Sequence, residues 1–220
     1  MIQIFHPSMN TIARLSIFGA VFLLLGLGVA VNYLVRSPVM TQVNVAQAQP
    51  VPFSHLHHVR QLGIECRYCH TSVEDSSFAG IPPTETCMTC HSQVWTEAAL
   101  LEPVRVSFRT GEPLQWNRVN NVSDFVYFNH SIHVNKGVGC ETCHGDVARM
   151  PLTWKSETLF MEWCLECHRQ PEKFIRPVEE VFTMGYELPA NHDQFVQAQQ
   201  LVVDYGIEVG RLDDCSICHR

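Results

Sequence analysis

The sequence lacks an excess of positive charge. Its 220 residues include 15 Lys and Arg against 22 Asp and Glu, which gives a formal net charge of −7. Nucleic-acid-binding domains normally carry a basic patch or stripe, so we expect no nucleic-acid partner. The sequence also lacks the alternating strand and helix patterns in which a thioredoxin-type thiol site is found. A thiol–disulfide exchange enzyme of that type is therefore not expected either.

No cysteine stands alone. The ten cysteines form five C-x-x-C pairs, and a histidine follows each pair directly, although histidine makes up only about one residue in twenty. The paired cysteines are Cys66 and Cys69, Cys87 and Cys90, Cys140 and Cys143, Cys164 and Cys167, and Cys215 and Cys218. The histidines that follow them are His70, His91, His144, His168 and His219.

Three explanations of these pairs compete. A disulfide framework predicts an even number of cysteines but does not explain the histidines. A zinc ribbon is the stronger alternative, because 17 residues separate Cys69 from Cys87 and 20 separate Cys143 from Cys164, as in zinc sites. Zinc leaves the fifth pair without a partner. Attachment of c-type haem through C-x-x-C-H accounts for all five pairs, so the sequence predicts five haem c groups.

The spacing suits the chemistry of a covalently held haem. Two thiols three positions apart reach the two vinyl groups at one edge of a porphyrin and form thioethers, and the next residue brings its imidazole to the iron. The 168 residues from Phe53 onward provide about 34 residues per motif. So few residues form only a thin core on their own, and we therefore expect the haems to make up much of the core.

A second histidine pattern precedes the first and third motifs. The segments FSHLHHV from Phe53 and FNHSIHV from Phe128 lie 75 positions apart, each about ten residues before a C-x-x-C-H. Histidines three positions apart on a helical turn project from one face, so each pair can supply sixth ligands to two neighbouring haems. Such pairs can also be ordinary surface or core histidines, but the repetition favours ligation. The predicted distal ligands are His55, His58, His130 and His133.

The fifth motif lacks such a pair. Met184 and His192 lie in the preceding stretch VFTMGYELPANHDQF, and we expect Met184 to be the sixth ligand, with His192 as the alternative. Methionine ligation raises the potential of a haem, which suits an exit site. The residues around His192 also resemble a helix capping box. A helix is predicted over residues 195–205, with Gly206 as its stop.

An apolar run lies near the N-terminus. Residues 15–35, LSIFGAVFLLLGLGVAVNYLV, contain no charge and are long enough to cross a bilayer. A cleaved signal peptide is the alternative, but the A-x-A at residues 46–48 lies far beyond the apolar run. We expect residues 1–36 to form a single-pass anchor. Residues 37–52 are uncharged and contain three prolines, which predicts an extended linker.

Orientation in the membrane has to come from the haems, because the charges that flank the span give almost no orientation signal. Attachment of c-type haem takes place on the outer side of bacterial membranes. We therefore expect the anchor in the bacterial inner (cytoplasmic) membrane and the haem domain on its periplasmic side.

Residues 53–220 are predicted to form one pentahaem cytochrome c domain with an internal duplication. Residues 53–96 and 128–171 repeat the same order of histidine pair, first motif and second motif, and residues 172–220 carry the fifth motif. We predict a mainly α and irregular fold with little or no sheet. Short helices carry the motifs, and the haems form the core.

Several segments together resemble a known family. The opening MIQIFHPSMNTIARLSIFGAVFLL, the FSHLHHV–CRYCH and FNHSIHV–CETCH repeats, IPPTETCMTCH and the terminal CSICHR are similar to the membrane-anchored pentahaem cytochrome c subunit of alternative complex III, a quinol:electron acceptor oxidoreductase. The resemblance covers nearly the whole chain. It implies the proximal and distal ligands named above, with one His/Met haem at Met184.

The resemblance also implies partners. In that family an iron–sulfur subunit related to molybdopterin oxidoreductases, NrfD-like quinol-binding membrane subunits and a monohaem cytochrome c accompany this subunit. Electrons from quinol pass through iron–sulfur and haem centres to a soluble carrier or an oxidase of a respiratory or photosynthetic chain. The chain is then not an enzyme alone and has no catalytic residue.

Two other functions compete with this one. A NapC/NirT-like quinol dehydrogenase also has one N-terminal anchor and several haems, but it oxidises quinol itself. A multihaem reductase of a small ligand would need an iron without a distal ligand, or a motif with Lys in place of His, and the sequence shows neither.

Overall fold

A computed structural model describes residues 5–187 and 194–219, and the chain divides into two compact units, residues 1–43 and 44–220. The first unit contains α1 (Ser8–Arg36) and α2 (Pro38–Thr41). Helix α1 has a mean hydropathy of 2.2 over its most apolar 18 residues and buries none of them, so it is long and apolar enough to cross a membrane. It ends at Arg36, because the next residue, Ser37, precedes Pro38 and a residue before proline disfavours helical backbone; Ser37 is extended with a ψ of 157°.

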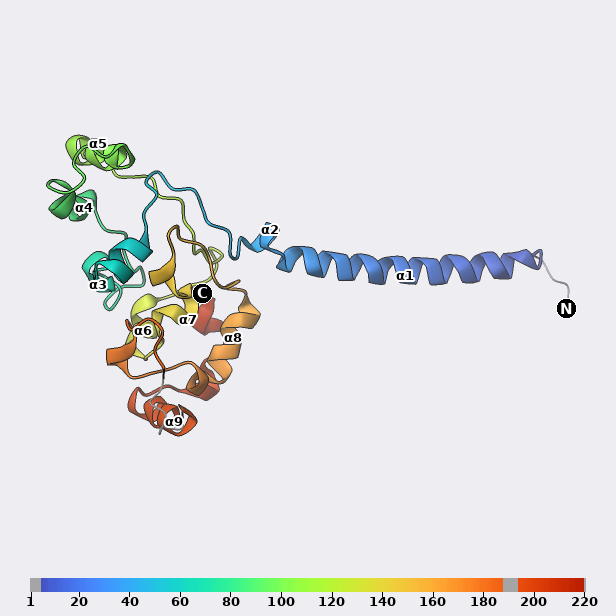
Figure 1. Cartoon of the computed structure of the whole chain (residues 1–220). Helices are drawn as coiled ribbons and strands as arrows, with labels where there is room; N and C mark the ends of the chain where they lie inside the picture. Colours follow the sequence, from blue (N-terminus) through green and yellow to red (C-terminus); the bar gives the residue numbers. More distant parts are fainter. Residues whose placement is uncertain (1–4, 188–193, 220) are drawn as a thin grey trace. The chain divides into compact units, whose positions relative to one another are not determined.

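The second unit consists of short helices joined by long irregular segments (Figure 1). Its α-helices are α3 (Cys66–Cys69), α4 (Thr84–His91), α5 (Glu102–Thr110), α6 (His130–Asn135), α7 (Cys140–His144), α8 (Met161–Arg169), α9 (Gln194–Asp204) and α10 (Cys215–Cys218). A π-helix, η1, spans Leu56–Gln61. Single 3₁₀ turns are η2 (Ala99–Leu101), η3 (Val147–Arg149), η4 (Pro171–Lys173), η5 (Val178–Glu180) and η6 (Val209–Arg211).

The prediction of a mainly helical fold without a sheet is confirmed for the described residues. Their only β-type pairings are two isolated bridges, Ala46 with Trp154 and Val138 with Ile175. The predicted helix over residues 195–205 is also confirmed: α9 covers Gln194–Asp204, Ala198 is buried, and Gly206 follows with a φ of 59°.

Each C-x-x-C-H motif lies on its own short helix. Helices α3 and α7 begin at the first cysteine of their motifs, Cys66 and Cys140. Helices α4 and α8 begin three residues before theirs, at Thr84 and Met161. We call residues 53–96 the first half and residues 128–171 the second half. The first and second motifs, in the first half, therefore have the same helix arrangement as the third and fourth motifs, in the second half.

The two histidine pairs lie on different kinds of helix. His58 stands eight positions before Cys66, whereas His133 stands seven before Cys140. The extra residue of the first half falls in the π-helix η1, where the Leu62 N–H donates to the His57 carbonyl five residues earlier (3.1 Å). A π-turn takes up one more residue than an α-turn and is frequent at functional sites.

Part of the segment predicted as an extended linker is helical instead, because residues 38–41 form α2. Residues 44–49 are hydrogen-bonded to distant parts of the second unit. The Asn44 N–H donates to the Lys155 carbonyl (2.8 Å), and the Gln47 N–H donates to the Thr153 carbonyl (3.4 Å). The Gln49 side chain also accepts from the Asn117 N–H (2.9 Å). These bonds hold residues 44–49 against the rest of the second unit.

The interior formed by protein side chains is small. Among the described residues, the buried hydrophobic side chains are Val51, Val73, Val104, Val134, Ala148, Met150, Ile175, Val181 and Ala198. Val73, Val134 and Val181 meet in one cluster, with Cys140 and Phe182 at its edge. This cluster joins the loop after α3 to α6 and to the segment before α9.

A tight crossing of two segments depends on Gly137. Its backbone has a φ of +79°, its carbonyl accepts from the Arg176 N–H (2.8 Å), and a Cβ added here would collide with the Arg176 carbonyl and the Tyr205 ring. We expect Gly137→Ala to lower the free energy of unfolding by more than about 2 kcal/mol, because a left-handed residue with a Cβ costs roughly 1–2 kcal/mol before any clash. Denaturant unfolding of the haem-loaded protein measures this loss.

Gly111 provides the matched control. It ends α5 with a φ of +74°, and nothing lies within 4 Å of a Cβ added to it. Gly111→Ala should therefore cost only about 1–2 kcal/mol, which is the conformational cost alone. Equal losses for the two variants would mean that the close approach of Arg176 to Gly137 has no energetic effect.

Candidate haem-binding site

Three of the motif histidines each face one of the paired histidines. The ring centroids of His58 and His91 lie 6.2 Å apart, those of His130 and His144 lie 6.4 Å apart, and those of His133 and His168 lie 6.2 Å apart. A metal–imidazole bond is about 2.0–2.1 Å long, so two imidazoles on opposite sides of one metal have centroids roughly 6 Å apart. The observed separations therefore fit an iron between each pair.

His55 and His70 lie close together in the same region. Burial, followed by the electrostatic effect of His70, lowers the pKa of His55 to about 4. Burial, followed by the effects of His130 and His70, lowers the pKa of His144 to about 4 as well. These imidazoles are therefore neutral at physiological pH, which is the state that binds a metal.

Hydrogen bonds orient most of these rings. A carbonyl oxygen can only accept, so a ring whose Nδ1 contacts one carries its proton there and keeps Nε2 free for a metal. Seven rings make this contact: His58 with Ser54, His70 with Gly80, His91 with Val94, His130 with Ser77, His133 with Asn129, His168 with Leu212 and His219 with Phe125, at 2.7–3.1 Å. The Nδ1 of His55 instead contacts the Thr153 hydroxyl (3.1 Å).

A phenylalanine stacks on the second histidine of each pair. The Phe53 ring lies 4.4 Å from that of His58, and the Phe128 ring lies 4.5 Å from that of His133. Both phenylalanines also meet the first histidine of their pair edge-on, at 4.9 and 4.8 Å. The repeated F-x-H-x-x-H pattern is the sequence signal for these ring contacts.

His57 lies between the two histidines of the first pair, meets the His58 ring edge-on at 5.2 Å and has its other contacts outside the pair. Its Nδ1 lies 3.0 Å from Gln61 Oε1, and its ring stacks on Trp95 with a centroid distance of 6.0 Å. The second half has Ile132 at the matching position. His57 is therefore a natural control for the histidines on either side of it.

No disulfide joins any of the ten cysteines, all of which lie among the described residues. Burial, followed by the nearby thiol of Cys66, raises the pKa of Cys140 to about 12. Burial, followed by the nearby thiols of Cys167 and Cys164, raises the pKa of Cys143 to about 12 as well. Sites that disfavour a charged thiolate suit thioether sulfurs, which carry no charge. Within the part of the chain that the structure describes, no three His, Cys, Asp or Glu side chains gather as a metal site, so the four ligands of a zinc ribbon are not brought together.

The structure leaves the sixth ligand of the fifth motif as a prediction. His219 lies against Phe125, whose ring is 5.6 Å away. Met184 precedes Gly185, whose N–H donates to Glu141 Oε2 on α7 (2.6 Å). No described contact brings Met184 to His219, and His192 lies outside the described residues.

A partly buried ion pair holds the third motif in place. Arg176 Nη1 lies 2.8 Å from Glu141 Oε1, and the two side chains are only 11% and 19% exposed. Glu141 is the residue after the first cysteine of CETCH. Arg176 also donates to the Thr183 carbonyl (3.2 Å) and lies over the Tyr186 ring. The segment before α9 is thereby fastened to α7.

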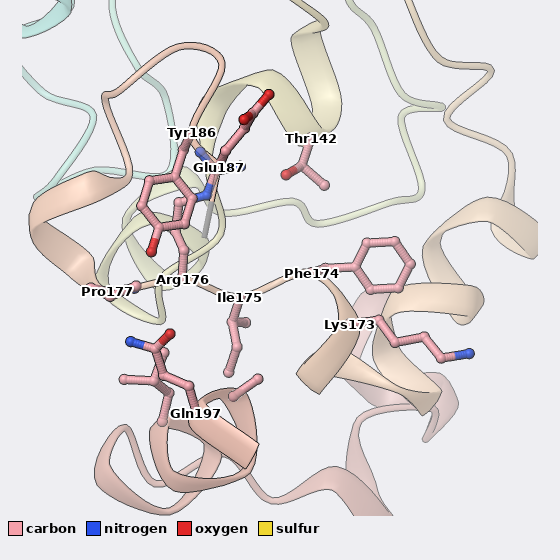
Figure 2. Close-up of a pocket in the computed structure, with 11 residues that line it drawn as sticks. Thr142, Lys173, Phe174, Ile175, Arg176, Pro177, Tyr186, Glu187 and Gln197 are labelled. Atoms are coloured by element: carbon pink, nitrogen blue, oxygen red, sulfur yellow. The ribbon is translucent and has the colours of Figure 1, made fainter. Parts of the chain in front are cut away.

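Arg176 also lines a cavity of about 330 Å³ (Figure 2). Its lining includes Thr142 of α7, residues 173–177, Tyr186, and Gln197 of α9. None of the ten cysteines or their following histidines lines it. It is therefore distinct from the sites of haem attachment.

Paired cysteines on short helices, each pair followed by an imidazole that keeps Nε2 available, are the arrangement with which a c-type cytochrome binds haem covalently. Residues 126–220 match the family described as cytochrome c7 and related cytochrome c. A multihaem cytochrome c subunit of a menaquinone reductase from Nitratidesulfovibrio vulgaris is 32% identical over 145 residues, which span 54% of this chain and 67% of the relative. This chain belongs to the multihaem cytochrome c family.

The ion pair on α7 generates a prediction. We expect Arg176→Met to lower the free energy of unfolding by about 3 kcal/mol, because it leaves Glu141 partly buried without its cation. The control is Arg211→Met, which removes the Arg211–Glu208 ion pair, in which both side chains are about 70% exposed. This variant should lower the free energy of unfolding by less than about 1 kcal/mol. Denaturant unfolding of the two haem-loaded variants makes the comparison, and similar losses would show that burial of the first pair has no effect.

Proposed function

We propose that the chain carries five haem c groups, numbered 1 to 5 in the order of their motifs, and that each paired histidine is the distal ligand of one of them. The axial pairs are His70 and His55 for haem 1, His91 and His58 for haem 2, His144 and His130 for haem 3, and His168 and His133 for haem 4. The centroid separations of 6.2–6.4 Å carry this assignment for haems 2, 3 and 4. The electrostatic effect of His70 on His55 supports it for haem 1.

The fifth haem is held by Cys215, Cys218 and His219. Met184 is the proposed sixth ligand, with His192 as the alternative. An iron closed on both faces binds no small ligand and only passes electrons. The paired histidines therefore favour electron transfer over reduction of a small molecule at an open iron.

The proposed role is that of an electron-transfer subunit of a membrane quinol:electron acceptor oxidoreductase of the alternative complex III type. The relative in Nitratidesulfovibrio vulgaris is a subunit of a menaquinone reductase, which supports a quinol-linked complex. The proposed partners are an iron–sulfur subunit related to molybdopterin oxidoreductases, NrfD-like quinol-binding subunits, a monohaem cytochrome c and a soluble acceptor. Helix α1 is the proposed anchor in the bacterial inner membrane, with the haem domain on the periplasmic side.

The ligand assignment predicts a change of spin state. Replacing His130 by Ala should convert one haem from low-spin to high-spin, because it removes one axial nitrogen. His57→Ala should leave every haem low-spin, because His57 faces Trp95 and Gln61. Electron paramagnetic resonance of the oxidised protein makes the comparison. A His130→Ala protein that keeps all its haems low-spin would contradict the assignment.

The role in a complex is tested by purification from membranes in mild detergent. We expect co-elution with multi-spanning and iron–sulfur subunits, and reduction of the haems by quinol only while those subunits are present. Quinol oxidation by the isolated chain would support the NapC/NirT-like alternative instead. Turnover of nitrite by the isolated chain would support a small-molecule reductase.

A further inference from the structure

We propose that the haems form one unbranched row in the order 2, 1, 3, 4, 5, which differs from the order of their motifs in the sequence. This order rests on the five haems proposed above. It makes haems 2 and 5 the two ends of the row, where electrons enter and leave. Haem 1 becomes an internal relay that joins the two halves.

Haems 2 and 1 are neighbours because their motif helices touch. The Tyr68 hydroxyl on α3 lies 3.1 Å from Thr89 Oγ1 on α4, and both residues stand between the cysteines of their motifs. His55 and His58 then serve the two haems from one helical segment. Helix α4 packs on its other flank against α5, where Thr84 Oγ1 and Ser107 Oγ lie 2.7 Å apart.

The junction between the halves runs through the first motif. The loop that follows α3 meets α6: the Ser77 carbonyl accepts from both the backbone N–H and the Nδ1 of His130, at 3.2 and 2.9 Å. The Asn135 side chain donates to the Glu74 carbonyl in the same loop (2.9 Å). His130 faces His144. The polypeptide that follows the haem 1 motif therefore positions the distal ligand of haem 3.

Contacts between protein residues join the site of haem 3 to that of haem 4, and the site of haem 4 to that of haem 5. Helix α6 carries both His130 and His133, which face the histidines of the third and fourth motifs. The Nδ1 of His168 then donates to the Leu212 carbonyl, three residues before Cys215 (2.7 Å). Beside it, Arg169 on α8 pairs with Asp213 (3.5 Å). One ligand histidine of haem 4 is thus oriented by the turn that leads into α10.

Two alanine variants on the same helical segment distinguish this order from the order of the motifs. His55→Ala makes haem 1 high-spin, and His58→Ala makes haem 2 high-spin. A high-spin ferric haem speeds the electron spin relaxation of its nearest neighbours. Each haem's low-spin signal is first assigned from the variant that removes it.

The proposed order predicts that His55→Ala speeds relaxation of two signals, those of haems 2 and 3, in the oxidised full-length chain. His58→Ala should speed only that of haem 1. The order of the motifs predicts the reverse: one affected neighbour for His55→Ala, and two, haems 1 and 3, for His58→Ala. That reversed pattern, or any pattern in which His58→Ala affects haem 3, overturns the proposal.

A second pair of variants covers the case in which an alanine variant loses its haem. In His55→Met and His58→Met the iron keeps two axial ligands, and the methionine raises the reduction potential of that haem. The altered haem is therefore reduced first. Its added negative charge then lowers the midpoint potentials of the neighbouring haems. His55→Met should shift the midpoint potentials of haems 2 and 3, whereas His58→Met should shift the midpoint potential of haem 1 alone. A shift in the midpoint potential of haem 3 in His58→Met overturns the proposed order. Both measurements use the isolated chain, so loss of the quinol complex would not affect them.

Discussion

The site depends on one constraint: each imidazole must present Nε2 to a metal while its Nδ1 is held elsewhere. Backbone carbonyls accept the Nδ1 proton of seven of these rings. This fixes both the tautomer and the direction of the ring. The acceptors for His58 and His133 lie four residues earlier on the same segment, whereas the acceptor for His130 comes from the other half of the molecule. The first kind of contact is local, and the second ties the two halves together.

The two halves reach the same ring arrangement through different backbones. One histidine pair lies on a π-helix and the other on an α-helix capped by Asn129, whose Oδ1 accepts from the Ser131 N–H (3.0 Å). The phenylalanine that stacks on the second histidine and the carbonyl that receives its Nδ1 proton are nevertheless the same in both. Ring geometry is therefore the shared feature, which fits the proposed ligand role, because a haem iron would bind the imidazole and not the backbone.

The interior formed by side chains is small for a domain of this length, with nine hydrophobic side chains buried among the described residues. Haem attached by thioethers, as proposed here, would add apolar volume to this interior and could not dissociate from it. The polypeptide itself stabilises the fold through a few specific contacts, such as the Arg176–Glu141 ion pair and the close crossing of two segments at Gly137. These points lie around the third motif, where the loop after α3, α6 and the segment before α9 meet.

The chemistry of haem attachment could be predicted from the sequence, because two thiols and an imidazole must stand at a set spacing to bind one haem. The histidine pairs, the short helices, the helix before Gly206 and the apolar helix near the N-terminus were predictable for the same local reason. The partner of each proposed distal histidine could not be predicted from the sequence. His130 meets His144, and His133 meets His168, only after the chain has turned between them. The contacts of Ser77 with His130 and of Leu212 with His168 span more than forty residues, and no local pattern encodes them. The proposed order of the haems rests on such long-range contacts, which only the folded chain brings about.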